Sequence, residues 1–255
     1  MKQFTRFFAI AAAVLLLSSC GIMNRTGVSA KYMPVMPNDV AEQIINKHGF
    51  VISYNHDTRL PNWVMWRLKS DHLTGDATRS GNSYHEDGAV PKPRAAAMDY
   101  HRSGWTRGHM CPAADNKWNK RAMFDSFAFT NICPQTERLN SGVWNEIEMD
   151  CREWARKYGE VFIICGPVPD RRLKTIGPNH VVVPEAFFKV VVCLKGGKKK
   201  GIGFICYNDE KLRQSEKQCV ASIEDIEDLT GINFFPNLNP REQKKIEQHA
   251  RLRDW

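Results

Sequence analysis

The clearest periodic segment of the chain runs over residues 140–158. Apolar residues recur in it at spacings of four and three, namely at Val143, Ile147, Cys151, Trp154 and Tyr158. Side chains at these spacings share one face of a helix. Gly159 follows directly, and glycine commonly ends helices because it tolerates a left-handed backbone. The pattern therefore predicts an amphipathic helix that begins at Asn140 and ends at Tyr158.

Shorter apolar runs, rich in β-branched and aromatic residues, predict strands. They cover residues 62–68, 127–132, 161–165, 186–194 and 201–207. Pro134 is expected to stop the second run, and a glycine-rich turn between the last two indicates a hairpin.

Polar segments and short helices separate these strands. Residues 70–98 predict a long surface connection, and residues 41–49 predict a short helix. Ser222 and Pro240 are expected to begin two further helices, as a capping residue and as a first helical residue. Antiparallel strands mixed with segregated helices favour an α+β fold.

The N-terminus resembles a bacterial lipoprotein signal. Lys2 and Arg6 give it a positive start, residues 7–17 are apolar, and a Leu-Ser-Ser-Cys sequence ends at Cys20. The alternative is an ordinary secretory signal with a chance cysteine.

Under the lipoprotein interpretation, residues 1–19 are removed and Cys20 is acylated, which attaches the chain to a membrane. Residues 20–40 form a tether, and residues 41–255 form one folded domain. We therefore expect an exported protein that is lipid-anchored in the bacterial cell envelope, on its periplasmic or cell-surface face.

The charge of the chain favours a polyanionic partner such as nucleic acid or an anionic lipid surface. The formal net charge is +8, and loss of Lys2 and Arg6 with the signal leaves +6. Hydrophobic residues make up 42% of the 255 residues, enough for one large core.

Seven cysteines follow Cys20, an odd number, so at least one thiol is free or pairs between chains. An exported protein can form disulfides, but the sequence does not determine which cysteines pair. Cys165, Cys193 and Cys206 lie in apolar runs, and we expect them to be small buried hydrophobic residues.

Four residues have the chemistry needed to hydrolyse a phosphodiester. His109 suits a general base, and an ordinary histidine pKa of about 6.5 predicts cleavage that rises through roughly pH 6–7. Arg107 can hold two phosphate oxygens. Asn140 at a helix start and Glu148 two turns later offer oxygen ligands of the kind that magnesium prefers.

Each of these residues also has a simpler interpretation. His109 can be a packed residue, and Arg107 can lie in an exposed turn. Asn140 can merely cap the helix, and Glu148 can pair with Arg152 on the helix surface. The catalytic interpretation is favoured because all the pieces occur together, in one order and spacing.

The assembly of motifs resembles the DNA/RNA non-specific endonucleases, which are ββα-metal (His-Me finger) nucleases. It includes Thr106-Arg107-Gly108-His109, the sequence TNICPQ over residues 130–135, and Asn140-x-Gly142-x-Trp144 with Glu148 downstream. Residues 187–191 and 229–236 also look like the family, and the resemblance covers roughly residues 45–240. It implies a central antiparallel sheet flanked by helices, with a strand pair and a helix as the active-site module.

The resemblance also implies a role for each residue. His109 would be the general base, Asn140 the direct magnesium ligand, Glu148 the holder of metal-bound water, and Asn131 a residue that orients groups near the metal. Arginines would contact the phosphate, namely Arg107, Arg152 and, less directly matched, Arg79. Manganese would be a possible substitute for magnesium.

The predicted function is therefore a magnesium-dependent endonuclease that cuts DNA and RNA with little sequence specificity. One position departs from the family, because Thr106 stands where an aspartate is usual, and this leaves open an altered or reduced activity. The alternatives are a narrower phosphodiesterase, a catalytically weak or silent nucleic-acid-binding lipoprotein, and an enzyme that uses Cys111 as a thiol nucleophile.

Overall fold

The structure of the chain is a computed structural model that describes residues 26–169, 174–195, 199–248 and 250–255. The proposed signal, Cys20 and the first part of the tether lie outside the described residues. Within the described part, no helix has both the length and the apolar character needed to cross a membrane.

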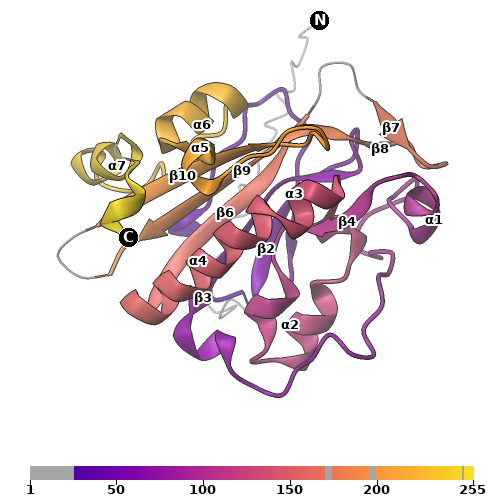
Figure 1. Cartoon of the computed structure of the whole chain (residues 1–255), viewed down its shortest axis with the longest axis horizontal. Helices are drawn as coiled ribbons and strands as arrows, with labels where there is room; N and C mark the ends of the chain where they lie inside the picture. Colours follow the sequence, from indigo (N-terminus) through magenta and orange to yellow (C-terminus); the bar gives the residue numbers. More distant parts are fainter. Residues whose placement is uncertain (1–25, 170–173, 196–198, 249) are drawn as a thin grey trace, which may run out of the picture.

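A seven-stranded antiparallel sheet forms the centre of the molecule (Figure 1). Its order is β1-β2-β3-β6-β9-β10-β11, and each pair of neighbours is antiparallel. The strands are β1 (Gln43–Asn46), β2 (Phe50–Asn55), β3 (Leu60–Lys69), β6 (Glu160–Pro169), β9 (Pro184–Cys193), β10 (Lys200–Tyr207) and β11 (Val220–Ala221). This confirms the predicted α+β fold with a central antiparallel sheet.

Both faces of the sheet are covered, because its strands are apolar on both sides. In β3, Val64 and Trp66 belong to the core on one face, and Trp63 and Met65 belong to the core on the other. This is the period-two alternation of a strand with two buried faces.

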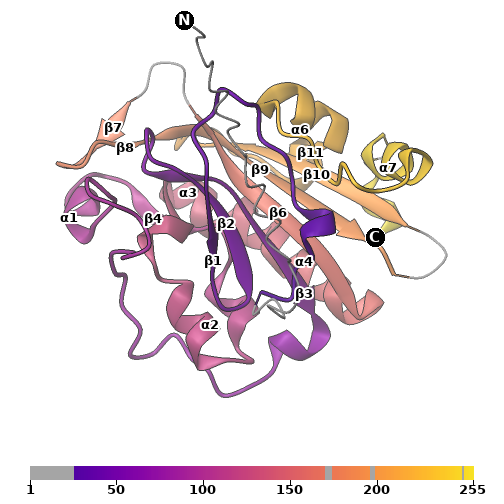
Figure 2. The same cartoon turned by 180° about the vertical axis from the view of Figure 1, so that it is seen from behind.

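A long helix and two short ones occupy opposite faces of this sheet. The first face packs against α4 (Val143–Tyr158), which lies in front of the sheet in Figure 1. The second packs against α6 (Ile223–Thr230), α7 (Pro240–Glu247) and the segment after residue 26, as seen from behind in Figure 2.

Small elements surround the sheet. Two short strand pairs lie outside it, β4 (Thr106–His109) with β5 (Ile132–Gln135), and β7 (Thr175–Ile176) with β8 (Val181–Val182). The short α-helices are α1 (Ala97–Tyr100), α2 (Lys120–Asp125), α3 (Glu137–Ser141) and α5 (Glu216–Cys219). Single 3-10 turns occur at Ala30–Tyr32, Ser70–Leu73, Ala113–Asn116, Phe129–Asn131 and Leu252–Asp254.

Most of the predicted elements are confirmed. Four of the five predicted strands correspond to β3, β6, β9 and β10, with the prediction for β9 extending one residue too far. Ser222 caps α6 by accepting a hydrogen bond from the Asp225 N–H, and Pro240 is the first residue of α7. The thiols of Cys165, Cys193 and Cys206 are buried as predicted.

Three local predictions are wrong. Residues 41–49 contain the strand β1 instead of a helix, because pairing with β2 outweighs a weak local preference. In the predicted strand over residues 127–132, Phe129–Asn131 form a 3-10 turn, and the strand begins only at Ile132. Pro134 lies inside that strand, opposite Arg107. Among the described strands, no third one adjoins this pair, so the missing N–H of Pro134 costs no sheet hydrogen bond.

The predicted helix over residues 140–158 is divided in two. Gly142, with φ −98° and ψ −121°, ends α3 and precedes α4. Asn140 therefore lies in the last turn of α3, and the long helix begins at Val143. The break places Asn140 and Glu148 on two different helices, which a helix pattern alone does not reveal.

Candidate active site

The strand pair β4–β5 carries Arg107 and His109, two of the predicted catalytic residues. Thr106 lies opposite Gln135, and His109 lies opposite Ile132 at the other end of the pair. Gly108 is required here, because a Cβ at this position would lie 2.0 Å from the Gln135 side-chain oxygen. The glycine lets the buried Gln135 side chain pass close to the β4 backbone and leaves His109 at the end of the strand.

His109 lies among aromatic rings. Its ring meets Phe127 edge-on with centroids 5.2 Å apart, and it is tilted against Tyr84 at 5.5 Å. Nε2 is buried and has no hydrogen-bond partner among the described residues. Burial, aided by the positive charge of Arg79, lowers the pKa of His109 to about 3.

His109 is therefore neutral at physiological pH and able to accept a proton. The prediction that cleavage rises through roughly pH 6–7 used the ordinary histidine pKa. Burial of His109 moves the expected rise to lower pH.

Asn140 is oriented by Thr106, the residue that stands where the endonucleases that the sequence resembles usually have an aspartate. The Asn140 Nδ2 donates to Thr106 Oγ1 at 3.0 Å, and Thr106 Oγ1 donates to the Gln135 carbonyl at 2.9 Å. Because the only hydroxyl proton goes to that carbonyl, Thr106 presents a lone pair to Asn140. This arrangement leaves Asn140 Oδ1 unused by protein donors in the described part of the chain.

Glu148 lies on α4 and joins a cluster of buried charges. Burial raises the pKa of Glu148 to about 7, and the positive charge of Lys189 partly opposes this rise. Arg152 Nη1 lies 3.8 Å from Glu148 Oε2 and 3.1 Å from Asp115 Oδ1. Arg152 thus joins two carboxylates, and its predicted contact with phosphate remains a prediction.

Asp115 and Lys189 are residues of this cluster to which the sequence analysis gave no role. Asp115 is 3% exposed and also accepts a hydrogen bond from the Trp66 indole at 3.1 Å. Lys189 is fully buried, with its Nζ 4.1 Å from the centre of a Trp144 ring and without a hydrogen bond in the described structure. The only signal in the sequence was a lysine inside an apolar strand.

Arg107 and Arg79 are available for an anion. The Arg107 guanidinium lies 5.1 Å from the Tyr84 ring centre, and that of the exposed Arg79 lies 5.7 Å from the Phe127 ring centre. Among the described residues, neither guanidinium has a carboxylate within 4 Å. Aromatic contacts hold both groups near His109 without neutralising them.

Asn131 holds the backbone that follows His109. It is fully buried, its Oδ1 accepts from the Cys111 N–H, and its Nδ2 donates to the carbonyls of Cys111 and Ser126. Both ends of the Asn131 amide are thus bonded to backbone groups. Asn131 therefore fixes the backbone at Cys111, two residues after His109. Cys111 is itself buried, and burial raises the pKa of its thiol well above the usual range, which disfavours a nucleophilic thiolate.

The residues present fit a metal that keeps most of its water. The free Asn140 Oδ1 and the Glu148 carboxylate are hard oxygen ligands, as magnesium prefers. In the described part of the chain, no three His, Cys, Asp or Glu side chains converge into a closed metal site. This arrangement suits a magnesium ion that is held by one or two protein ligands and otherwise by water.

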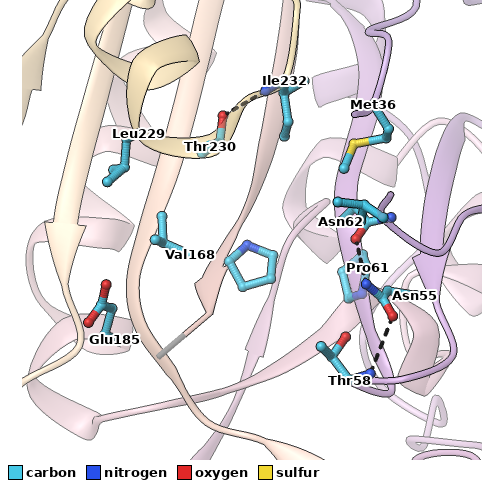
Figure 3. Close-up of a pocket in the computed structure, with 12 residues that line it drawn as sticks. Met36, Asn55, Thr58, Pro61, Asn62, Val168, Glu185, Leu229, Thr230 and Ile232 are labelled. Atoms are coloured by element: carbon cyan, nitrogen blue, oxygen red, sulfur yellow. Dashed lines mark hydrogen bonds between the residues drawn. The ribbon is translucent and has the colours of Figure 1, made fainter. Parts of the chain in front are cut away.

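The cavity in Figure 3 is distinct from this site. It measures about 310 Å³ and lies between the segment around Met36, the β2–β3 turn and the end of α6 at Thr230. None of the predicted catalytic or metal-binding residues lines it.

Residues 28–241 match the family model of DNA/RNA non-specific endonucleases. The chain belongs to this family. It is a nuclease that hydrolyses nucleic acids, and the family's enzymes depend on a metal.

Two mitochondrial relatives support this family assignment, and one solved structure shares the fold. The mitochondrial nuclease EXOG of Mus musculus is 31% identical over 260 residues, which cover 90% of this chain and 71% of that protein. Mitochondrial endonuclease G of Bos taurus is 34% identical over 214 residues, which cover 78% and 71%. The EndoG/EndoGI crystal structure aligns with a TM-score of 0.75 and 24% identity over 82% of this chain and 92% of that one, and it supports the same fold.

Proposed function

We propose that the chain is a magnesium-dependent endonuclease that cuts DNA and RNA with little sequence preference. The observation that carries this proposal is the environment of His109, a neutral imidazole held beside two guanidinium groups that no carboxylate of the described residues neutralises. A proton acceptor next to unpaired positive charge is what attack of water on a phosphodiester requires.

In this proposal, His109 takes a proton from the water molecule that attacks phosphorus. Arg107 and Arg79 hold the non-bridging phosphate oxygens and stabilise the charge that develops on them. The surrounding rings of Tyr84 and Phe127 keep the imidazole in place and limit its solvation. The leaving oxygen departs with a proton from solvent.

Asn140 and Glu148 would hold the metal, Asn140 through Oδ1 and Glu148 through bound water. Magnesium, with manganese as a substitute, would supply positive charge to the phosphate and the leaving oxygen. Both ligands would be oriented by neighbouring residues. Arg152 forms an ion pair with Glu148, and Thr106 accepts a hydrogen bond from Asn140.

The low sequence preference follows from the groups in the site. The proposed contacts of Arg107 and Arg79 are with phosphate, which is common to DNA and RNA and carries no base identity. We also propose that the chain is exported and anchored through acylated Cys20, on the basis of the signal-like N-terminus alone.

The decisive experiment compares cleavage with binding. His109→Ala removes the proton acceptor but no fixed positive charge, so cleavage of plasmid DNA and of RNA should fall by roughly 10²–10⁴-fold. Binding of a short duplex, measured without divalent metal, should stay within a few fold of wild type. A chelator should abolish cleavage by wild type, and magnesium or manganese should restore it.

The same experiment decides between the enzyme and a silent binder. If wild type does not nick plasmid with either metal while it binds DNA as tightly as His109→Ala, the chain is a binding protein. If His109→Ala cuts at the wild-type rate, the catalytic base lies elsewhere.

A further inference from the structure

An aromatic and cationic surface on α2 is not used by the proposed chemistry. Phe124 is 41% exposed, although it is a large apolar side chain. The His85 ring stacks on it, with centroids 4.1 Å apart and planes 14° apart, and the Arg121 guanidinium lies 5.3 Å from its centre. Three flat groups are thus assembled at the surface, where a nucleobase can extend the stack.

This stack is directly connected to the catalytic centre. The His85 N–H donates to the Phe127 carbonyl, and the Phe129 N–H donates to the His85 carbonyl. Neighbouring side chains on such an extended segment point to opposite sides. Tyr84 accordingly contacts His109 while His85 contacts Phe124.

The charges around the stack suit a nucleic-acid backbone. Lys117, Lys120 and Arg121 are exposed. The loop that carries Arg79 is bonded to this surface, because the Ala77 N–H donates to the Lys117 carbonyl at 3.1 Å. The loop that carries Arg79 and the segment that leads into α2 are therefore adjacent.

The acidic groups near the stack are paired with cations. Arg121 Nε lies 2.9 Å from the buried Asp125 carboxylate, which offsets part of the Arg121 charge, and Glu86 is paired with Arg94 at 2.8 Å. Lys120 meets Asp76 at 3.8 Å with both side chains more than 80% exposed. An ion pair so exposed contributes little and leaves Lys120 free to meet a phosphate.

We propose that His85, Phe124 and Arg121, with Lys117 and Lys120, form a subsite for the strand of nucleic acid beside the scissile phosphate. One base stacks on the His85–Phe124 pair, and the two lysines contact the neighbouring phosphates. This subsite rests on the proposed nuclease function, and it adds a stacking contact to a site otherwise built from phosphate contacts. The occupant is a single-stranded or locally unpaired segment, since a paired base is not free to stack on a protein ring.

Substitutions at Phe124 distinguish stacking from simple burial. Phe124→Leu keeps an apolar side chain but removes the aromatic face, whereas Phe124→Trp keeps and enlarges that face. We expect Phe124→Leu to raise the Kd for a 12-nucleotide single-stranded DNA, measured without divalent metal, by roughly 5- to 150-fold. Phe124→Trp should bind within a few fold of wild type.

The controls lie on the far face of the molecule. Leu229→Ala removes an equally exposed apolar side chain, 46% exposed, and Lys244→Ala with Lys245→Ala removes two exposed charges from α7. These variants should bind within about twofold of wild type, whereas Lys117→Ala with Lys120→Ala should bind more weakly and show a shallower salt dependence. The thermal melting point of each variant shows that it is folded.

The steady-state constants give a second readout. On long single-stranded DNA, Phe124→Leu should raise KM while kcat changes only a few fold, because the reacting groups stay in place. Binding of single-stranded DNA by folded Phe124→Leu at wild-type affinity would overturn the subsite. Failure of wild type to cleave would count against the nuclease function alone, since the binding comparison needs no turnover.

Discussion

At the scale of single residues, the site depends on groups whose protonation is set by their surroundings. His109 is neutral because aromatic rings and Arg79 disfavour a second proton. Glu148 has a raised pKa because it is buried, and Lys189, Asp115 and Arg152 surround it. Neither property belongs to the residue type, and both follow from packing.

The depressed pKa of His109 predicts loss of stability in acid. In the unfolded chain His109 binds a proton below about pH 6.5, and in the folded chain only near pH 3. Its contribution is therefore present above pH 6.5 and is lost as the pH falls towards 3, by about 1–2 kcal/mol at pH 5. Urea unfolding at pH 7.5 and pH 5, with a chelator, should show a smaller loss for His109→Gln than for wild type.

That comparison also isolates His109 from Glu148. The raised pKa of Glu148 acts with the opposite sign, since its contribution is present below about pH 4.5 and is lost as the pH rises through about 7. It is common to wild type and His109→Gln and cancels in their difference. Equal acid sensitivity of the two proteins would show that His109 has an ordinary pKa.

Thr106 predicts a difference in metal dependence. Thr106→Val keeps the shape of the side chain but removes the acceptor for Asn140 Nδ2, so Asn140 is no longer oriented. The concentration of magnesium needed for half-maximal cleavage should rise by roughly 10–100-fold. Thr106→Ser retains the hydroxyl and should stay close to wild type. A Thr106→Val enzyme with unchanged magnesium dependence would remove Thr106 from this positioning role.

At the scale of elements, the site depends on a break between two helices. α3 carries Asn140 and α4 carries Glu148, and Gly142 joins them in a conformation that a continuous helix would not allow. Thr136 begins α3 by accepting the Leu139 N–H. The break therefore decides how Asn140 and Glu148, the two proposed metal ligands, are placed relative to each other.

Gly142→Ala is expected to disturb this break. A Cβ at Gly142 would lie 2.4 Å from the Arg138 carbonyl oxygen, which belongs to the backbone and cannot move away cheaply. We expect a loss of about 1–3 kcal/mol in the free energy of unfolding, with reduced cleavage because Asn140 is displaced. Gly88→Ala is the control, since no atom lies within 4 Å of its added Cβ. A Gly142→Ala protein as stable as Gly88→Ala would contradict this account.

At the scale of the whole molecule, the sheet separates two surfaces. One carries the strand pair, α2, α3 and α4, and the other carries α6, α7 and the segment that leads from the N-terminus (Figures 1 and 2). The central strands are apolar on both sides because each face of the sheet packs against one of these two cores. The N-terminal segment after residue 26 thus packs opposite the proposed active site.

Anchoring is a prediction about the whole chain. Cys20→Ala removes the proposed acylation site and should leave a precursor or a soluble form in place of a membrane-bound protein. Cell fractionation with mass spectrometry of the mature N-terminus measures this. An unmodified N-terminus downstream of Cys20 in the wild-type protein would refute the lipoprotein interpretation.

Patterns local in the sequence determined much of the fold. The apolar runs of β3, β6, β9 and β10 and the stripe of α4 were predictable, because side-chain periodicity reports directly on which faces are buried. The motif residues His109, Arg107, Asn140 and Glu148 were likewise identifiable from their order and spacing.

Only the tertiary structure decided the features that depend on distant segments. β1 forms because β2 is available to pair with it, and Thr106 meets Asn140 because β4 lies against α3. The lowered pKa of His109 and the charge cluster around Glu148 arise from side chains that lie far apart in sequence. Desolvation and pairing act through space, so a linear pattern identifies the participating residues but not their charge, orientation or partners.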